Sequence, residues 1–157
     1  FVVGTGPNRS IAEYFFFYLR ALRPGVTFVP TLDLDLSHVL KDQGPKSLAV
    51  VFSFPRYPAA TQRITEKIRS RGIPVIGITD SALSPLAPLS DLLLESKMKF
   101  ISFIDPSGAT MALMHSLLVG LYLQDPVLTK KQVRYFEDEI QDQKFFLRPD
   151  LDIVDLL

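Results

Sequence analysis

The 157-residue sequence contains no cysteine and no tryptophan, and its only two histidines, His38 and His115, lie far apart. The absence of cysteine excludes disulfide bonds, thiolate metal ligands and a cysteine nucleophile. Two distant histidines do not indicate a histidine-rich zinc site. We therefore expect neither a metal nor a cofactor in this protein.

The sequence also lacks an excess of charge of either sign, because 17 basic residues balance 17 acidic ones. A surface that binds nucleic acid is usually basic, so this balance argues against DNA contact by these residues. It also argues against binding to an anionic membrane surface. No segment resembles a signal peptide, and no apolar run reaches membrane-spanning length. We expect a cytoplasmic protein that contacts no membrane.

What the sequence does contain is an alternation of short β-rich runs and helical patterns, which predicts parallel βαβ units. We expect one domain with a three-layer α/β/α fold around a five-stranded parallel sheet of flavodoxin-like order. Its core covers residues 1–124, and a C-terminal helix and tail cover 125–157. The expected strands cover residues 1–5, 26–30, 48–53, 73–79 and 92–95, and residues 100–104 form another short extended run. The expected helices cover residues 11–23, 34–41, 58–71, a segment capped by Asp105 with Pro106 in its first turn, and 128–146.

Two of the helical segments carry more apolar surface than one packed face needs. They are "YFFFYL", residues 14–19, and the run at residues 111–123. A helix that is apolar on all sides is buried on all sides, so both segments predict a subunit interface. The alternative is a wide core against the sheet. The last helix has an apolar stripe formed by Val133, Phe136 and Ile140, and the tail at residues 147–157 is apolar enough to dock on the protein.

The loop after the first expected strand, "GTGPNRS", has the character of an anion-binding loop. In an open sheet of this order, ligands bind beyond the carboxyl ends of the first and third strands. Gly4 and Gly6 allow the backbone to approach a ligand closely, and Arg9 adds a positive charge. Asn8 or Ser10 can cap the helix or donate to an anion, and free amides at the helix start favour negative charge. The alternative is a tight turn with a purely structural role.

The loop after the third expected strand, "SFPRYP", lies across the same crevice in this fold. It offers Ser53, Arg56 and Tyr57 to a ligand. Arg56 can bind a carboxylate or a phosphate through two parallel hydrogen bonds. The alternatives are a solvated or interface arginine, a packed tyrosine, and a loop that serves only as a stiff elbow.

The end of the fourth expected strand adds further polar groups on the ligand side. Thr79 and Asp80 end this strand, and Ser84 precedes Pro85, where it can cap a short helix. We expect Thr79 and Ser84 to contribute to the ligand site. Turn formation alone is the alternative for this segment.

The sequence resembles a sugar isomerase (SIS) domain, and specifically the C-terminal domain of RpiR-type transcriptional regulators. The segments "SFPRYPAAT", "RGIPVIGITDSALSPLA" and "FIDPSGATMALMHSLLVGL" carry this resemblance, which covers residues 1–124. It implies a five-stranded parallel sheet, a dimer or larger assembly, and a sensor of a small ligand, often a phosphosugar. In that family an N-terminal helix-turn-helix domain binds DNA, and we expect it to be absent from these residues.

The sequence departs from the phosphosugar-binding pattern of the family. Such domains present Ser-x-Ser-Gly-x-Thr where this chain has "SFPRYP", and a serine where it has Asn8. Pro55 and Pro58 replace the second serine and the threonine, and proline has neither a hydroxyl nor an amide hydrogen. Arg56 replaces the lost hydroxyls with charge, or the ligand is not a phosphosugar.

The alternative function is an aldose–ketose isomerase on the same fold. Isomerisation needs a base beside a carbonyl and a group that stabilises the enediolate. The candidate bases are Glu13, Glu66, Glu95 and His115, and no motif brings two of them together. We therefore expect no enzyme activity and no catalytic residue.

A nucleotide-binding Rossmann-like protein is a third hypothesis. The dinucleotide pattern Gly-x-Gly-x-x-Gly fails because Arg9 stands at its third glycine. Asp33 and Asp35 follow the second expected strand closely enough to leave a ribose contact open.

Overall fold

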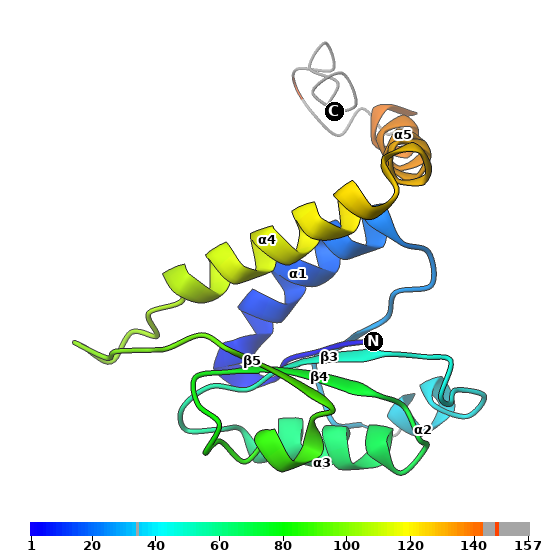
Figure 1. Cartoon of the computed structure of the whole chain (residues 1–157). Coiled ribbons are helices and arrows are strands. Elements are labelled where there is room, and N and C mark those ends of the chain that lie inside the picture. Colours follow the sequence, from blue (N-terminus) through cyan, green and yellow to red (C-terminus); the bar gives the residue numbers. More distant parts are fainter. Residues whose placement is uncertain (34, 143–146, 148–157) are drawn as a thin grey trace.

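The computed structural model describes residues 1–33, 35–142 and 147. Its centre is a parallel five-stranded sheet in the order β2-β1-β3-β4-β5. The strands are β1 (Val2–Val3), β2 (Phe28–Val29), β3 (Ala49–Phe52), β4 (Val75–Thr79) and β5 (Leu92–Glu95). This order and the helices on both sheet faces confirm the predicted α/β/α fold (Figure 1).

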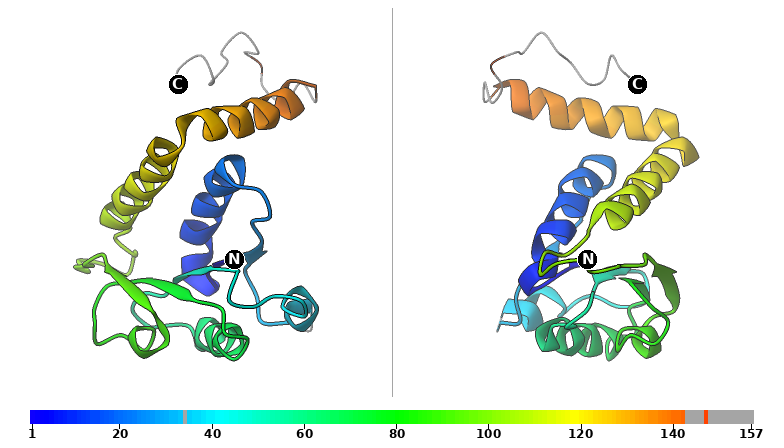
Figure 2. Two further views of the ribbon diagram at one scale, coloured as in Figure 1. Left: turned by 45° about the vertical axis from the view of Figure 1, so that its right-hand side comes forward. Right: turned by 90° about the vertical axis from the view of Figure 1, so that its left-hand side faces the viewer.

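The helices divide between the two faces of the sheet. Helices α2 and α3 cover one face, whereas α1 and α4 lie side by side over the other (Figure 1). Helix α5 turns sharply away from the end of α4 (Figure 2). The helices are α1 (Arg9–Leu22), α2 (Asp35–Val39), α3 (Ala59–Arg69), α4 (Gly108–Gln124) and α5 (Pro126–Asp142), with 3-10 turns η1 (Gly6–Asn8) and η2 (Ala87–Leu89).

The central strands are apolar throughout because both of their faces are buried. Side chains alternate along a strand, so neighbouring residues enter different cores. Val3 and Val51 join the core beneath α3, whereas Val2 and Val50 join the core beneath α1. The continuous apolar run at Leu48–Phe52 is thus explained by two cores rather than one.

Helix α4 begins later than the sequence predicts. The amide of Met111 donates to the carbonyl of Ser107, and the first helical residue is Gly108. The prediction that Asp105 caps this helix is therefore wrong. Aspartate and serine are both favoured helix-capping types, so the pattern does not separate Asp105 from Ser107. Residues 100–104 belong to an exposed loop and form no strand.

Helix α4 is apolar nearly all round, yet only Thr110, Met114 and Leu118 are buried on it. Within the described residues, no single helix combines the length and hydropathy needed to cross a bilayer, whereas α4 and α5 pass that test only as a pair bent by 112°. Helix α5 begins two residues earlier than predicted, at Pro126. Its expected last turn at 143–146 and most of the expected tail lie outside the described residues.

Candidate ligand site at the carboxyl edge of the sheet

The two predicted ligand loops lie next to each other at the carboxyl edge of the sheet. They follow β1 and β3, which pair directly, and β2 lies on the other side of β1. A Cβ placed on Gly6 would lie only 3.8 Å from Cγ of Pro58. The hydroxyls of Thr5 and Thr61 are 2.8 Å apart and fully buried, so they join the first loop to α3. The strand order therefore brings together the loops that the sequence singled out.

Gly4 packs α1 against the sheet. A Cβ at this position would lie 2.4 Å from Cβ of Ala12 and 2.8 Å from the carbonyl oxygen of Asn8. Only glycine permits this approach. Gly6 has a φ of +55°, a conformation that glycine adopts without strain. Both glycines thus have a conformational role that is independent of any ligand.

Two of the amides that the sequence suggested for anion binding are used within the first loop. The amide of Asn8 donates to the carbonyl of Thr5, and the amide of Arg9 donates to the carbonyl of Gly6. Pro7 favours this tight 3-10 turn, which satisfies these two amides within the loop. The Ser10 hydroxyl donates back to the carbonyl of Pro7 at 3.5 Å and does not cap α1.

Asn8 is the unusual residue of this loop. Its side chain is 3% exposed, and its Nδ2 has no hydrogen-bond partner among the described residues. It makes no capping bond to α1. A buried donor without a partner is unfavourable, which makes this amide a candidate for a bound ligand or water. Arg9 lies outside, in an exposed ion pair with Glu13 at 3.5 Å.

The second loop contains a strained turn. The amide of Tyr57 donates to the carbonyl of Phe54 at 2.7 Å, and Pro55 and Arg56 occupy the centre of the turn. Arg56 has a φ of +68° and Tyr57 one of +35°, values that residues other than glycine rarely adopt. The family motif has glycine at the position of Arg56. The backbone of Arg56 thus has a conformation that glycine adopts readily, although its side chain is a guanidinium.

Two contacts hold this turn in place. Phe54 is fully buried in the core beneath α1, and the Tyr57 hydroxyl donates to Oδ1 of Asp80 at 2.9 Å. Burial raises the pKa of Tyr57, and the hydrogen bond to Asp80 and the charge of that carboxylate raise it further. The sequence indicated Asp80 only as the end of β4, and a contact that spans 23 residues carries no local sequence signal.

Ser53 and Thr79 lie at the ends of β3 and β4, and both are buried. The backbone amide of Ser53 donates to the carbonyl of Ile78, which continues the ladder to the edge. The Thr79 hydroxyl donates to Oδ1 of Asp80 at 3.3 Å. Both side chains therefore lie beside the loops, and Thr79 helps to hold Asp80.

Ser84 does not cap a helix, so that prediction is wrong. The short turn η2 begins at Ala87 with Leu86 before it, and the Ser84 carbonyl accepts from the amide of Ala87. The backbone carbonyl of Ser84, rather than its hydroxyl, thus accepts a hydrogen bond from the amide of Ala87. Its hydroxyl is left without a partner among the described residues, although the residue is only 2% exposed.

Among the described residues, the site thus combines an unpaired guanidinium with two buried polar groups that lack hydrogen-bond partners. Arg56 is exposed, and no described residue forms an ion pair or hydrogen bond with its guanidinium. It precedes α3, whose N-cap is Pro58, a residue that cannot donate a hydrogen bond. Two cavities lie elsewhere, over the α1 and α4 face of the sheet.

The four candidate bases do not meet at this edge. Glu13 pairs with Arg9, Glu95 pairs with Lys97, and Glu66 accepts a hydrogen bond from Gln62. His115 lines a cavity among α1, α4 and α5. Across the described part of the chain, no group of three His, Cys, Asp or Glu side chains is placed to hold a metal ion.

A family model for the SIS domain matches residues 1–120. The chain belongs to the SIS domain family, as the sequence motifs indicated. No curated protein sequence matches the chain.

Solved structures share the fold. The sugar isomerase domain of an RpiR transcription factor from Sphaerobacter thermophilus is 23% identical, with a TM-score of 0.80 over 87% of this chain and 76% of that one. A ligand-bound Escherichia coli protein is 17% identical, with a TM-score of 0.71 over 85% and 73%. The Vibrio vulnificus NanR protein complexed with ManNAc-6P is 19% identical, with a TM-score of 0.71 over 90% and 54%.

Proposed function

We propose that this chain is the effector-sensing and dimerisation domain of a cytoplasmic RpiR-type transcriptional regulator. The effector is a small, phosphorylated sugar-like molecule that binds at the loops after β1 and β3. DNA contact is made by a domain outside these residues. The likeness to RpiR and NanR structures supports the class of effector, because NanR is complexed with the phosphosugar ManNAc-6P.

The proposal rests mainly on Arg56, which has a strained backbone conformation and an exposed side chain. Residues in rare backbone conformations cost free energy and cluster at ligand-binding loops. Arg56 holds an exposed guanidinium, without a partner among the described residues, at the position where the family motif has glycine. The buried amide of Asn8 lies in the adjacent loop and lacks a partner there. A guanidinium and an amide donor suit a phosphate group and a neighbouring sugar hydroxyl.

The sensor role is favoured over the isomerase role by the candidate bases. Glu13, Glu66 and Glu95 are exposed and engaged by neighbours, so none is poised as a base at the loops. We propose that the domain binds its ligand without transforming it.

Thermal-shift assays with ManNAc-6P, other phosphosugars and the corresponding unphosphorylated sugars test the ligand proposal. A phosphosugar at about 100 times its Kd should raise the melting midpoint by roughly 5 to 10 °C. Arg56→Ala should abolish this shift, whereas Arg63→Ala, an exposed arginine on α3, should preserve it. A shift that survives Arg56→Ala, or that the unphosphorylated sugars match, would overturn the role of Arg56.

We also propose that α4 forms the dimer interface. The helix is apolar nearly all round, yet three of its 17 residues are buried in one chain, and Leu123 remains 64% exposed. Such an exposed apolar surface marks a partner site. Analytical ultracentrifugation should show a dimer that Leu123→Glu converts to monomer. Leu83→Glu, at a 94% exposed loop position, is the matched control and should leave the dimer intact.

A further inference from the structure

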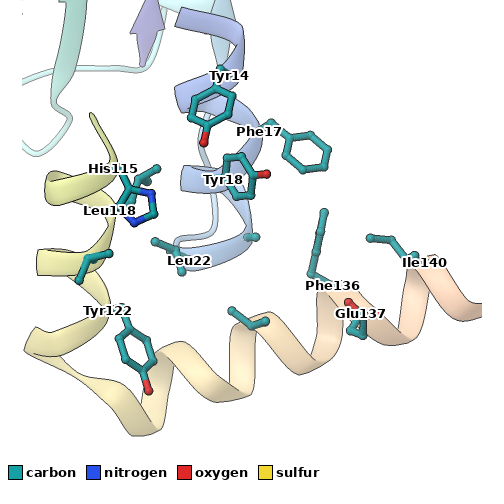
Figure 3. Close-up of a pocket in the computed structure, with 13 residues that line it drawn as sticks. Tyr14, Phe17, Tyr18, Leu22, His115, Leu118, Tyr122, Phe136, Glu137 and Ile140 are labelled. Atoms are coloured by element: carbon teal, nitrogen blue, oxygen red, sulfur yellow. The ribbon is translucent and has the colours of Figure 1, made fainter. Parts of the chain in front are cut away.

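A cavity of about 470 Å³ lies among α1, α4 and α5 and shares no residue with the loops at the carboxyl edge. Figure 3 shows side chains from all three helices around this space. Its volume is within the range of small-molecule sites. The lining is mainly apolar and includes five aromatic residues: Tyr14, Phe17, Tyr18, Tyr122 and Phe136.

Glu137 is the one carboxylate among the described residues that line this mainly apolar cavity. It lies on α5 on the cavity side, is only 4% exposed, and has no hydrogen-bond or ion-pair partner among the described residues (Figure 3). A buried carboxylate is strongly unfavourable unless a cation or several donors compensate its charge. Among the described residues, no cation and no hydrogen-bond donor compensates this charge.

The sequence of α5 places this carboxylate in the middle of its apolar stripe. Val133 precedes Glu137 by four residues and Ile140 follows it by three, which puts all three on one helix face. Phe136 completes the stripe and also contacts Phe17 of α1 edge to face. A solvent-facing glutamate would stand on the opposite side of the helix, where the exposed Glu139 stands.

We propose that this cavity binds an apolar organic cation of the arylalkylamine type, with its ammonium group on Glu137. Aromatic faces attract cations through their quadrupole, and the carboxylate supplies the opposite charge. The apolar walls take up the remainder of the molecule. The single carboxylate repels phosphate and carboxylate groups, so this ligand differs in charge from the effector proposed for the carboxyl edge. His115 is the only residue with a basic side chain among the described lining residues, and it faces the cavity from α4.

Calorimetric titration of the 157-residue chain with 2-phenylethylamine tests this inference, and 2-phenylethanol is the neutral probe of the same shape. The amine should bind at least about tenfold more tightly than the alcohol. Glu137→Gln should abolish this preference, because glutamine keeps the shape and removes the charge. Glu139→Gln is the matched control on the exposed face of α5 and should leave the preference unchanged.

A second variant tests the location without changing the charge. Val119 lines the cavity from α4, and Val119→Phe should weaken binding of both probes by reducing the space. The inference is wrong if the two probes bind equally, if the amine does not bind, or if Glu137→Gln leaves its affinity intact. A Glu137→Gln chain that changes its oligomeric state without any amine binding would instead assign the carboxylate to contact with a second copy.

Discussion

The two faces of the sheet differ in how completely one chain covers them. Among the described residues, the core beneath α3 contains eleven buried apolar residues and two partly buried ones, Phe1 and Leu32. The core beneath α1 and α4 contains ten buried residues and twelve partly buried ones. Cavities of about 470 and 630 Å³ lie on this second side. Within the described residues, the α3 face is almost fully covered, whereas the α1 and α4 face retains more partly buried apolar surface.

This difference assigns separate tasks to the two faces. Apolar burial is the main contribution to folding, so the α3 face supplies stability that does not depend on a partner. The incompletely covered face supplies the surfaces for which we propose a second copy and a cationic ligand. The loops at the carboxyl edge lie between them, because the strands that end there contribute to both cores.

Truncation of one residue on each face should give the largest contrast. Ile64 of α3 is fully buried, and Ile64→Ala should lower the free energy of unfolding by about 2 to 5 kcal/mol. Leu117 is half-buried and lines the larger cavity, so Leu117→Ala should cost only about 1 kcal/mol. Urea unfolding of both variants measures the difference. Equal losses of unfolding free energy in the two variants at low protein concentration would contradict this contrast. Losses that become equal only at high protein concentration would indicate that a second copy covers the α1 and α4 face.

Two glycines provide the next contrast, because each permits a close approach on one face. At Gly4, on the α1 side, a Cβ would meet the Cβ of Ala12 and a backbone oxygen, neither of which can rotate away. At Gly77, on the α3 side, the nearest atom is the hydroxyl oxygen of Ser90, which can rotate. Gly4→Ala should cost about 2 to 3 kcal/mol and Gly77→Ala about 1 kcal/mol. Melting midpoints measured by calorimetry test this order, and a larger loss at Gly77 would reverse it.

The sequence was sufficient to predict the sheet and the proximity of the two loops proposed as the ligand site. Apolar runs bounded by turn residues gave all five strands, and the carboxyl ends of parallel strands share one edge. The conformation of Arg56 was not predictable, because "PRY" contains no glycine to signal a positive φ. The burial of Asn8 and the contact from Tyr57 to Asp80 depend on how α1 packs and on residues far apart in sequence.

The cavity around Glu137 also escaped sequence analysis, although one signal was available. The stripe of Val133, Phe136 and Ile140 was recognised, but the glutamate on the same face was read as part of a charged helix. A pattern identifies a helix face, whereas only the three-dimensional arrangement shows whether that face meets solvent. This is why the sequence predicted the juxtaposition of the carboxyl-edge loops but did not indicate the cavity around Glu137.

Arg56→Gly should separate stability from ligand binding at the edge between the two faces. Glycine adopts a φ of +68° without steric strain, so this substitution should raise the free energy of unfolding by about 1 kcal/mol. It should also lose the phosphosugar response, because the guanidinium is gone. Parallel urea unfolding and thermal-shift assays check both outcomes. A destabilised Arg56→Gly would mean that contacts of the arginine side chain outweigh the backbone strain.

The smallest expected effect concerns Asp91, which links α3 to β4 on the α3 face of the sheet. Its Oδ2 accepts hydrogen bonds from Nη1 of Arg69 on α3 and from the amide of Val75 on β4. The bond from Arg69, followed by that from Val75, holds the pKa of Asp91 below its ordinary value of 3.8. Since the folded state favours the charged form, this contribution is complete above the ordinary pKa and disappears as the pH falls through the lower folded pKa.

Asp91→Asn should therefore lower the melting midpoint slightly at neutral pH, and the difference from the unmodified protein should vanish only in strong acid. The effect is small because the ion pair is exposed to solvent and screened by salt. Asp138→Asn, at an exposed position on α5, is the matched control and should show no such pH dependence. A difference in melting midpoint that grows as the pH falls would mean that the folded state disfavours the charged form of Asp91. That result would contradict the lowered pKa and the stabilising role of this carboxylate.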